Sequence, residues 1–223
     1  MKTKLPAFLL FLLVACQPST TDTQTSSGTE KSPDYAALQT ELEEIYDTDQ
    51  KVRAIDWDSL MQLGPEANRA HSMKMMKVDS LNKLRVIPIL EQHGWLPKSK
   101  IGEKASRGMY YVVQHSDLQT IEKYLPQMEA LAKQGEASTK DAATMRDRLL
   151  MFQGKKQIHG TQASSWVRES GNMVIWPIED VENVNNRRKE AGFETTVEEN
   201  ANHLGADYNP QEELPKKDSN RHH

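Results

Sequence analysis

The spacing of apolar residues constrains this chain most, because between residues 34 and 153 it follows the period of an α-helix almost throughout. In the first segment, from about 34 to 55, Leu38, Leu42 and Ile45 recur on one face. The same pattern predicts further helices at about 66–92, at 105–115, after residue 116 and at 138–153.

The second of these segments is apolar almost all round, which predicts a central helix. One of its stripes contains Met73 and Leu84, and the opposite stripe has Asn82 at its centre. We expect Pro88 to kink this helix or end it early, and Gly94 to follow it as a C-cap residue.

Several helix starts carry a capping pattern, in which a short polar side chain binds the free N–H groups of the first turn. The predicted N-caps are Ser116 with Gln119, Ser138 with Asp141, Asp180, and Thr196 with Glu199.

The period changes after residue 153. Residues 156–162 are predicted to be extended, and residues 164–168 and 173–176 are predicted to form a hairpin around a turn at 169–172. Two short helices should follow, at about 180–192 and 196–205. We therefore predict a mainly α (α+β) fold, a single compact multi-helix domain with one small β-hairpin near residues 156–177.

The N-terminus has the pattern of an export signal. Lys2 and Lys4 precede an apolar run at 5–15 that is too short to span a bilayer comfortably. The run ends Leu13-Val14-Ala15-Cys16, which resembles the lipobox of bacterial lipoproteins. The resemblance implies cleavage after residue 15, lipid transfer to Cys16 and anchoring to a cell-envelope membrane, most readily the outer membrane or the periplasmic face. The alternative is a buried cysteine within an ordinary cleaved signal.

This interpretation divides the chain into a signal peptide at 1–15, a lipidated flexible tether at 16–33, a helical domain at 34–205 and a disordered polar tail at 206–223. Cys16 is the only cysteine, which excludes an internal disulfide framework and Cys-rich zinc modules. With 28 basic and 32 acidic residues, the net charge of −4 speaks against a nucleic-acid partner.

Two polar positions interrupt the predicted apolar stripes. Asp49 falls in the middle of the first stripe with Arg53 beside it, and Asn82 lies in a stripe of the second helix. Charged residues rarely lie within a buried stripe unless they are paired. Asp49 and Arg53 either form an i,i+4 pair at the edge of the stripe or turn inward to a polar site, and Asn82 either satisfies backbone groups or joins that site.

His115 is the candidate general acid or base, because imidazole transfers protons near neutral pH. Asp147 or Asp49 would orient it, and Arg148 or Arg53 would hold an anionic group. Further ligand hydrogen bonds would come from Gln157, Thr161 and Gln162. The alternative is that the ring nitrogens of His115 are hydrogen-bonded within a buried polar network and have a structural role.

The adjacent guanidiniums of Arg187 and Arg188 either lie on a solvated helix face or clamp a carboxylate or phosphate.

A longer set of motifs runs through the folded part: Asp49-Gln50-x-x-Arg53, Asn82, Gly94-Trp95, Gly102, Gln114-His115, Asp147-Arg148, Gly154-x-x-Gln157-x-x-Gly160-Thr161-Gln162, Pro177-x-Glu179-Asp180, Arg187-Arg188 and Gly192. Between about residues 41 and 204 they resemble a bacterial domain-of-unknown-function family that includes many envelope lipoproteins. The resemblance implies a shared fold and a set of positions, among them Gln50, Gln114 and His159, and no particular reaction. His159 departs from the family, whose members usually carry Tyr there.

The chain contains no standard catalytic signature, and we predict neither a metal site nor a cofactor. The function we expect is that of an exported, lipid-anchored envelope protein that binds a small ligand in a polar pocket. Two alternatives stay open, a hydrolase that uses His115 and an envelope scaffolding module whose polar network is purely structural. The expected partners are a membrane, through Cys16, and a small ligand or an envelope protein.

Overall fold

The computed structural model describes residues 32–215, except the side chains of residues 57, 58 and 61. The predicted signal peptide, Cys16 and nearly all of the tether lie outside the described residues. The description below concerns the unit that begins at residue 33. None of the described helices has both the length and the apolar character needed to cross a membrane.

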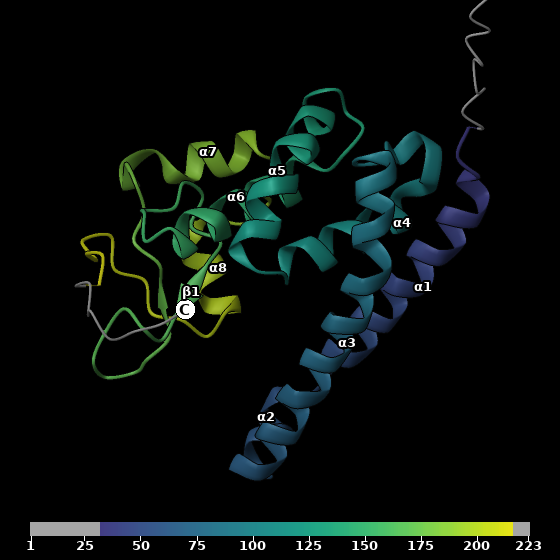
Figure 1. Ribbon diagram of the computed structural model, residues 1–223. Helices are drawn as coiled ribbons and strands as arrows, with labels where there is room; N and C mark the ends of the chain where they lie inside the picture. Colours follow the sequence, from purple (N-terminus) through teal and green to yellow (C-terminus); the bar gives the residue numbers. More distant parts are fainter. Residues whose placement is uncertain (1–31, 216–223) are drawn as a thin grey trace, which may run out of the picture. The chain divides into compact units, whose positions relative to one another are not determined.

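The described unit is mainly α-helical, and its single small sheet is an antiparallel pair in which Ala163 lies opposite Ile175 (Figure 1). This confirms the predicted fold class. The elements in chain order are α1 (Tyr35–Arg53), α2 (Trp57–Gln62), α3 (Pro65–His93), α4 (Lys98–Gln114), α5 (Leu118–Lys133), α6 (Thr139–Phe152), β1 (Ala163–Ser164), β2 (Val174–Ile175), the 3₁₀ helix η1 (Val181–Asn183), α7 (Val184–Glu190) and α8 (Val197–His203).

Helices α1 and α4 pack very closely because a glycine lies at their contact. A Cβ added to Gly108 would come within 2.3 Å of the Leu42 carbonyl oxygen. Seven residues further along each helix, Asp49 of α1 again lies beside His115 at the end of α4. The two helices therefore run side by side in the same direction, and their packing sets the spacing of these two side chains.

The prediction of a central α3 is wrong for one of its faces. Met73, Met76 and Leu84 are 62%, 68% and 73% exposed, whereas Val86 and Leu90 are buried. Periodicity identifies apolar positions but does not show which of them another element covers. Pro88 does not end the helix, which continues to His93 before Gly94 closes it with a positive φ of 68°.

Helix α5 begins one residue later than predicted. Its N-cap is Asp117, whose carboxylate accepts the Thr120 N–H, while the Ser116 hydroxyl donates to the Val112 carbonyl at the end of α4. A carboxylate at a helix N-terminus also gains from the helix dipole, which favours Asp117 over its neighbour. The predicted caps at Ser138 and Thr196 are confirmed.

The segment 156–162, predicted to be extended, curls instead. Gly160 has a φ of 68°, and among the described residues the segment joins other strands only near its two ends, at the bridge from Gln157 to Ile178 and through the Gln162 carbonyl, which accepts the Trp176 N–H. The hairpin strands are two residues each, shorter than expected. Asp180 has a φ of 49° and makes no capping bond, so its predicted role as an N-cap is also wrong.

Residues 206–215, which we expected in a disordered tail, belong to the folded unit. Asp207 bridges to Val174, and the Glu212 carboxylate accepts a 2.6 Å bond from Arg168. Residues 216–223 lie outside the described part. Helix α2 is an element that the apolar pattern did not predict.

Candidate functional site

The polar residues predicted to share one site form two clusters. The first, called here the His115 centre, comprises Asp49, Arg53, Asp79 and His115. The second, called here the Asp147 network, lies around Asp147 and the segment 157–162.

In the His115 centre, the carboxylate of Asp49 is 1% exposed and is held by side chains alone. Arg53 Nη1 donates to Asp49 Oδ1 at 2.6 Å, and Gln50 Nε2 donates to Asp49 Oδ2 at 2.9 Å. Arg53 Nη2 also donates to Asp79 Oδ1 of α3 at 2.7 Å. Asp49 and Arg53 thus form the predicted i,i+4 pair, in which Asp49 is buried and Arg53 is partly exposed.

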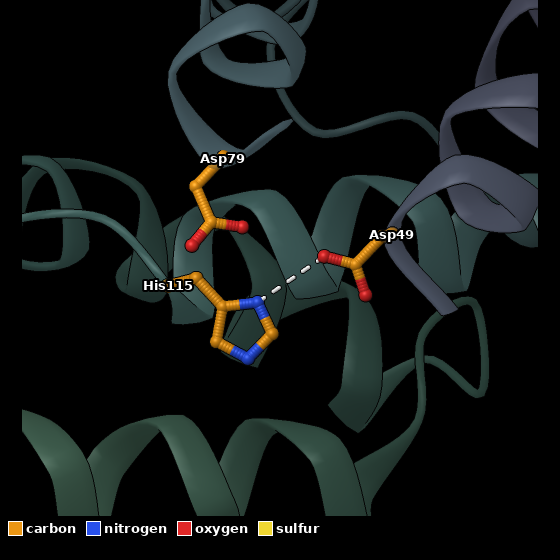
Figure 2. Close-up of side chains that lie close together, drawn as sticks. All are labelled: Asp49, Asp79 and His115. Carbon is orange, nitrogen blue, oxygen red and sulfur yellow. Dashed lines mark ion pairs between the residues drawn. The ribbon is translucent and has the colours of Figure 1, made fainter. Parts of the chain in front are cut away.

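His115 ends α4 as its C-cap residue and directs one ring nitrogen at Asp49. Nδ1 lies 3.4 Å from Asp49 Oδ1, and the ring stacks on Tyr111 with an interplanar angle of 16°. The other nitrogen, Nε2, points away from both carboxylates (Figure 2). The side chain is 20% exposed, so a ligand can reach it.

Arg148 of α6 is half-buried and has no counterion among the described side chains. Its Nε is buried without a hydrogen-bond partner, and its guanidinium lies 5.8 Å from the centre of the Phe152 ring. Burial lowers the pKa of Arg148, the nearby phenol of Tyr110 opposes this shift, and the positive charge of Arg53 adds to it. Arg148 and Arg53 of the His115 centre are thus near enough for their positive charges to repel each other.

Two buried side-chain amides on the helices of the His115 centre each have one atom without a hydrogen-bond partner among the described residues. They are Asn82 Nδ2, on α3 three residues after Asp79, and Gln114 Oε1, beside His115. Asn82 is 2% exposed and Gln114 is 4% exposed. Buried polar atoms in native proteins are nearly always hydrogen-bonded, so these two atoms are unusual.

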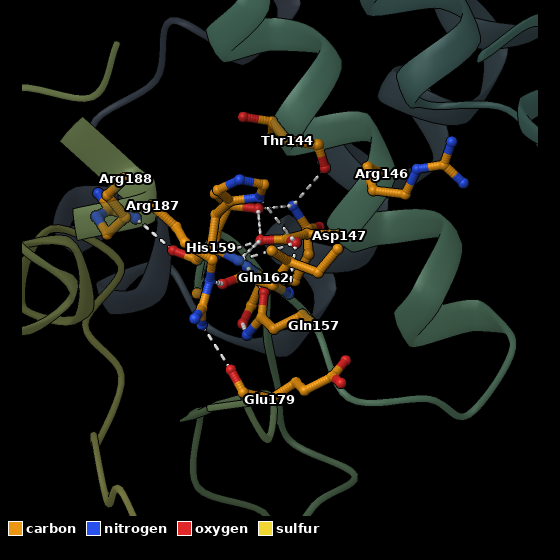
Figure 3. A network of polar contacts seen from close by, with 12 residues as sticks. Thr144, Arg146, Asp147, Gln157, His159, Gln162, Glu179, Arg187 and Arg188 are labelled. Atoms are coloured by element: carbon orange, nitrogen blue, oxygen red, sulfur yellow. Dashed lines mark hydrogen bonds and ion pairs between the residues drawn. The ribbon is translucent and has the colours of Figure 1, made fainter. Parts of the chain in front are cut away.

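Asp147 differs from Asp49, because its carboxylate accepts hydrogen bonds from the backbone of a neighbouring loop (Figure 3). It is fully buried and accepts the backbone N–H groups of Ile158, His159 and Thr161, together with the Thr161 hydroxyl. It makes no contact with His115. Of the two carboxylates predicted to orient this histidine, Asp49 and not Asp147 lies beside it.

The amides of Gln157 and Gln162 tie the same loop together. Gln157 Nε2 donates to the carbonyls of Gln162 and Trp176 at 2.9 and 2.6 Å, and its Oε1 accepts the Gln162 N–H. Gln162 Nε2 donates to the Thr144 carbonyl and the Thr161 hydroxyl. None of these groups is available to a ligand.

Arg187 and Arg188 form neither a solvated face nor an anion clamp. Arg187 donates to the carbonyl of Ile158 and to Asp180, and the almost fully buried Arg188 donates to the carbonyls of His159 and Thr195. Burial lowers the pKa of Arg188, and the cation lies over the ring of Phe193. Both guanidiniums therefore hold α7 against the loop.

A shallow surface hollow of about 350 Å³ lies away from His115. It is lined by Glu129, Ala132, Lys133, Thr139, Ala142, Ala143, Arg146, Ile158 and His159. Its wall is largely apolar, its Arg146 is already paired with Glu129, and the buried Nδ1 of its His159 has no hydrogen-bond partner among the described residues.

Asp79 is the functional candidate that sequence reasoning missed. Its signal is its spacing, because it precedes the predicted Asn82 by three residues and therefore lies on the same face of α3.

Residues 33–210 match a family described as a family of unknown function, DUF6624. No curated protein and no solved structure matches the chain.

Proposed function

The chain belongs to the DUF6624 family, whose function is unknown, and for this member we propose an exported, lipid-anchored envelope protein that binds a small anion at the His115 centre. The ligand class is a carboxylate or a phosphate.

The observation that carries this proposal is the uncompensated guanidinium of Arg148. A half-buried cation without a counterion keeps part of its desolvation cost, and an incoming anion would offset that cost by supplying the missing partner. Arg53 cannot serve equally well, because Asp49 and Asp79 already neutralise it. Arginine binds carboxylates and phosphates through two parallel N–H bonds, which defines the ligand class.

The test is anion binding by the chain without residues 1–15 and with Cys16→Ser, measured by thermal shift and calorimetry. The probes are inorganic phosphate, small mono- and dicarboxylates, and cell-wall fragments that carry carboxylates. We expect at least one of them to stabilise the protein and Arg148→Met to abolish the effect.

Arg146→Met is the matched control, since Arg146 lies on the same helix but is paired with Glu129. Its anion binding should equal that of the parent chain. A panel without any stabilising anion, or a stabilisation that persists in Arg148→Met, would refute the anion site.

Export and anchoring are supported by the charged start, the apolar run and the single cysteine at position 16. We expect the chain expressed in a bacterium to incorporate a labelled fatty acid and to sediment with membranes. Cys16→Ser should lose both properties. Equal sedimentation of the two forms without label would contradict lipidation.

A second candidate function, acid–base hydrolysis, is favoured by one observation. Asp49 lies at Nδ1 of His115, which leaves Nε2 directed away from the carboxylates and able to take a proton (Figure 2). Chromogenic phosphate and carboxylate esters would test it: turnover should disappear in His115→Gln and fall in Asp49→Asn. Turnover that survives His115→Gln in full would exclude this mechanism.

A further inference from the structure

Three potential metal ligands from three helices converge in the His115 centre. They are one oxygen of Asp49, one oxygen of Asp79 and a ring nitrogen of His115, and these atoms all lie within 4.8 Å of one another (Figure 2). Imidazole and carboxylate are the ligands that bind divalent first-row metals such as Zn²⁺ and Mn²⁺.

One pair of these atoms already has the spacing of metal ligands. Two ligands at about 2.0–2.1 Å from a tetrahedral ion are about 3.3 Å apart. Asp49 Oδ1 and His115 Nδ1 are 3.4 Å apart, and Nδ1 is buried without a hydrogen bond among the described residues. A metal ion between them would satisfy this nitrogen.

The positive charge that such an ion would bring is at present supplied by Arg53. Its guanidinium holds Asp49 Oδ1 and Asp79 Oδ1, and therefore joins the same two carboxylates that would bind the ion. At 23% exposure this side chain has room to move toward solvent. Gln50 holds the other oxygen of Asp49, as an outer-shell group orients a metal-bound carboxylate.

We infer that Asp49, Asp79 and His115 form a binding site for one divalent transition-metal ion, and that Arg53 is its internal competitor. Three protein ligands leave a coordination position open, as in catalytic sites, so a ligand oxygen can reach the ion. This inference does not depend on the anion site at Arg148.

The experiment is calorimetric titration with Zn²⁺ and, separately, Mn²⁺, supported by the visible spectrum of bound Co²⁺. The protein is the chain from residue 16 with Cys16→Ser, His222→Gln and His223→Gln, which removes metal-binding groups outside the described residues. We expect one ion per chain and a loss of at least about tenfold in affinity in His115→Gln and in Asp79→Asn. Asp79 is partly exposed, so its variant should keep the fold, which near-UV circular dichroism checks.

Arg53→Met separates this inference from a purely structural cluster. Removal of the competing cation should tighten metal binding about fivefold. If Arg53→Met does not fold, Arg53→Gln provides the same comparison. Arg148→Met should bind metal like the parent chain, even though it loses the anion.

Two results would overturn the inference: the absence of stoichiometric binding in both the parent chain and the Arg53 variant, or an affinity that His115→Gln and Asp79→Asn leave unchanged. Either result would leave the anion site untouched, because that proposal is tested at Arg148.

Discussion

Asp49 and Asp147 are two buried aspartates that each lie beside a histidine. Their hydrogen-bond donors differ, because Asp49 is bound by side chains and Asp147 mainly by backbone N–H groups. Exposure is 1% for Asp49 and 0% for Asp147, and the distances to Nδ1 of the adjacent histidine are 3.4 and 3.5 Å. Asp147 accepts backbone N–H groups, whose positions are fixed by the loop. Asp49 is bound only by side chains, which can rotate away.

The difference separates a structural carboxylate from one that can exchange partners. Release of Asp147 would leave several backbone donors buried and unsatisfied, which costs free energy for each of them. Release of Asp49 from Arg53 leaves that guanidinium on Asp79 and near solvent. Of these two carboxylates, Asp49 is therefore the one that can change partners without loss of backbone hydrogen bonds.

The largest expected effect is that of Asp147→Asn. Asparagine would present an NH₂ group to backbone donors, and we expect a loss of about 3–5 kcal/mol in the free energy of unfolding. Urea denaturation measures it. Asp180→Asn, in an exposed pair with Arg187, is the control and should cost about 1 kcal/mol or less. A cost for Asp147→Asn no larger than that of the control would remove the distinction between the two aspartates.

Asp49→Asn should destabilise the protein less, by about 1–2 kcal/mol, because Arg53 keeps its bond to Asp79. The same urea titration gives the value, and near-UV circular dichroism should remain that of the parent. A loss equal to that of Asp147→Asn would mean that the His115 centre is as structural as the Asp147 network.

Arg148→Met should leave the unliganded protein as stable as before, or more stable by up to about 1 kcal/mol, since it removes a half-buried charge that has no counterion among the described side chains. Thermal and urea denaturation both measure this. Arg146→Met, which breaks an ion pair, should instead lose about 0.5–1 kcal/mol. A clear destabilisation by Arg148→Met would indicate a partner for this cation and weaken the anion site.

The smallest effect is expected for His159→Tyr, within about 0.5 kcal/mol. Asp147 receives the backbone N–H of His159 at 3.1 Å, a bond that any side chain at this position leaves intact. The free energy of unfolding and the metal affinity of this variant should both equal those of the parent chain. A large loss in either would give the His159 ring a role that its geometry does not indicate.

Local patterns predicted the helices well because their causes are local. The capping hydroxyls of Ser138 and Thr196 act within three residues, and the stripe containing Leu42 and Ile45 is buried as expected. The exposure of Met73 and Leu84 was not predictable, because it depends on which distant element covers a face.

The site was predicted in part for the same reason. Asp49 and His115 stood out as a charge in an apolar stripe and a histidine at a helix end, and the fold brings them together. Gln157 was expected with them, but the curled segment turns it into a backbone brace instead. Asp147 was expected near His115, but its partners are N–H groups of a loop whose shape the period of the sequence does not predict.

Gly108 affects the proposed ligand site at His115, which lies two helical turns further along α4. A methyl group at this position would collide with the carbonyl of Leu42, and α1 would have to move outward to make room. The gap between Asp49 and His115 would then widen although neither had been altered. The absence of a side chain at Gly108 thus keeps Asp49 and His115 close enough to bind the proposed ligand together.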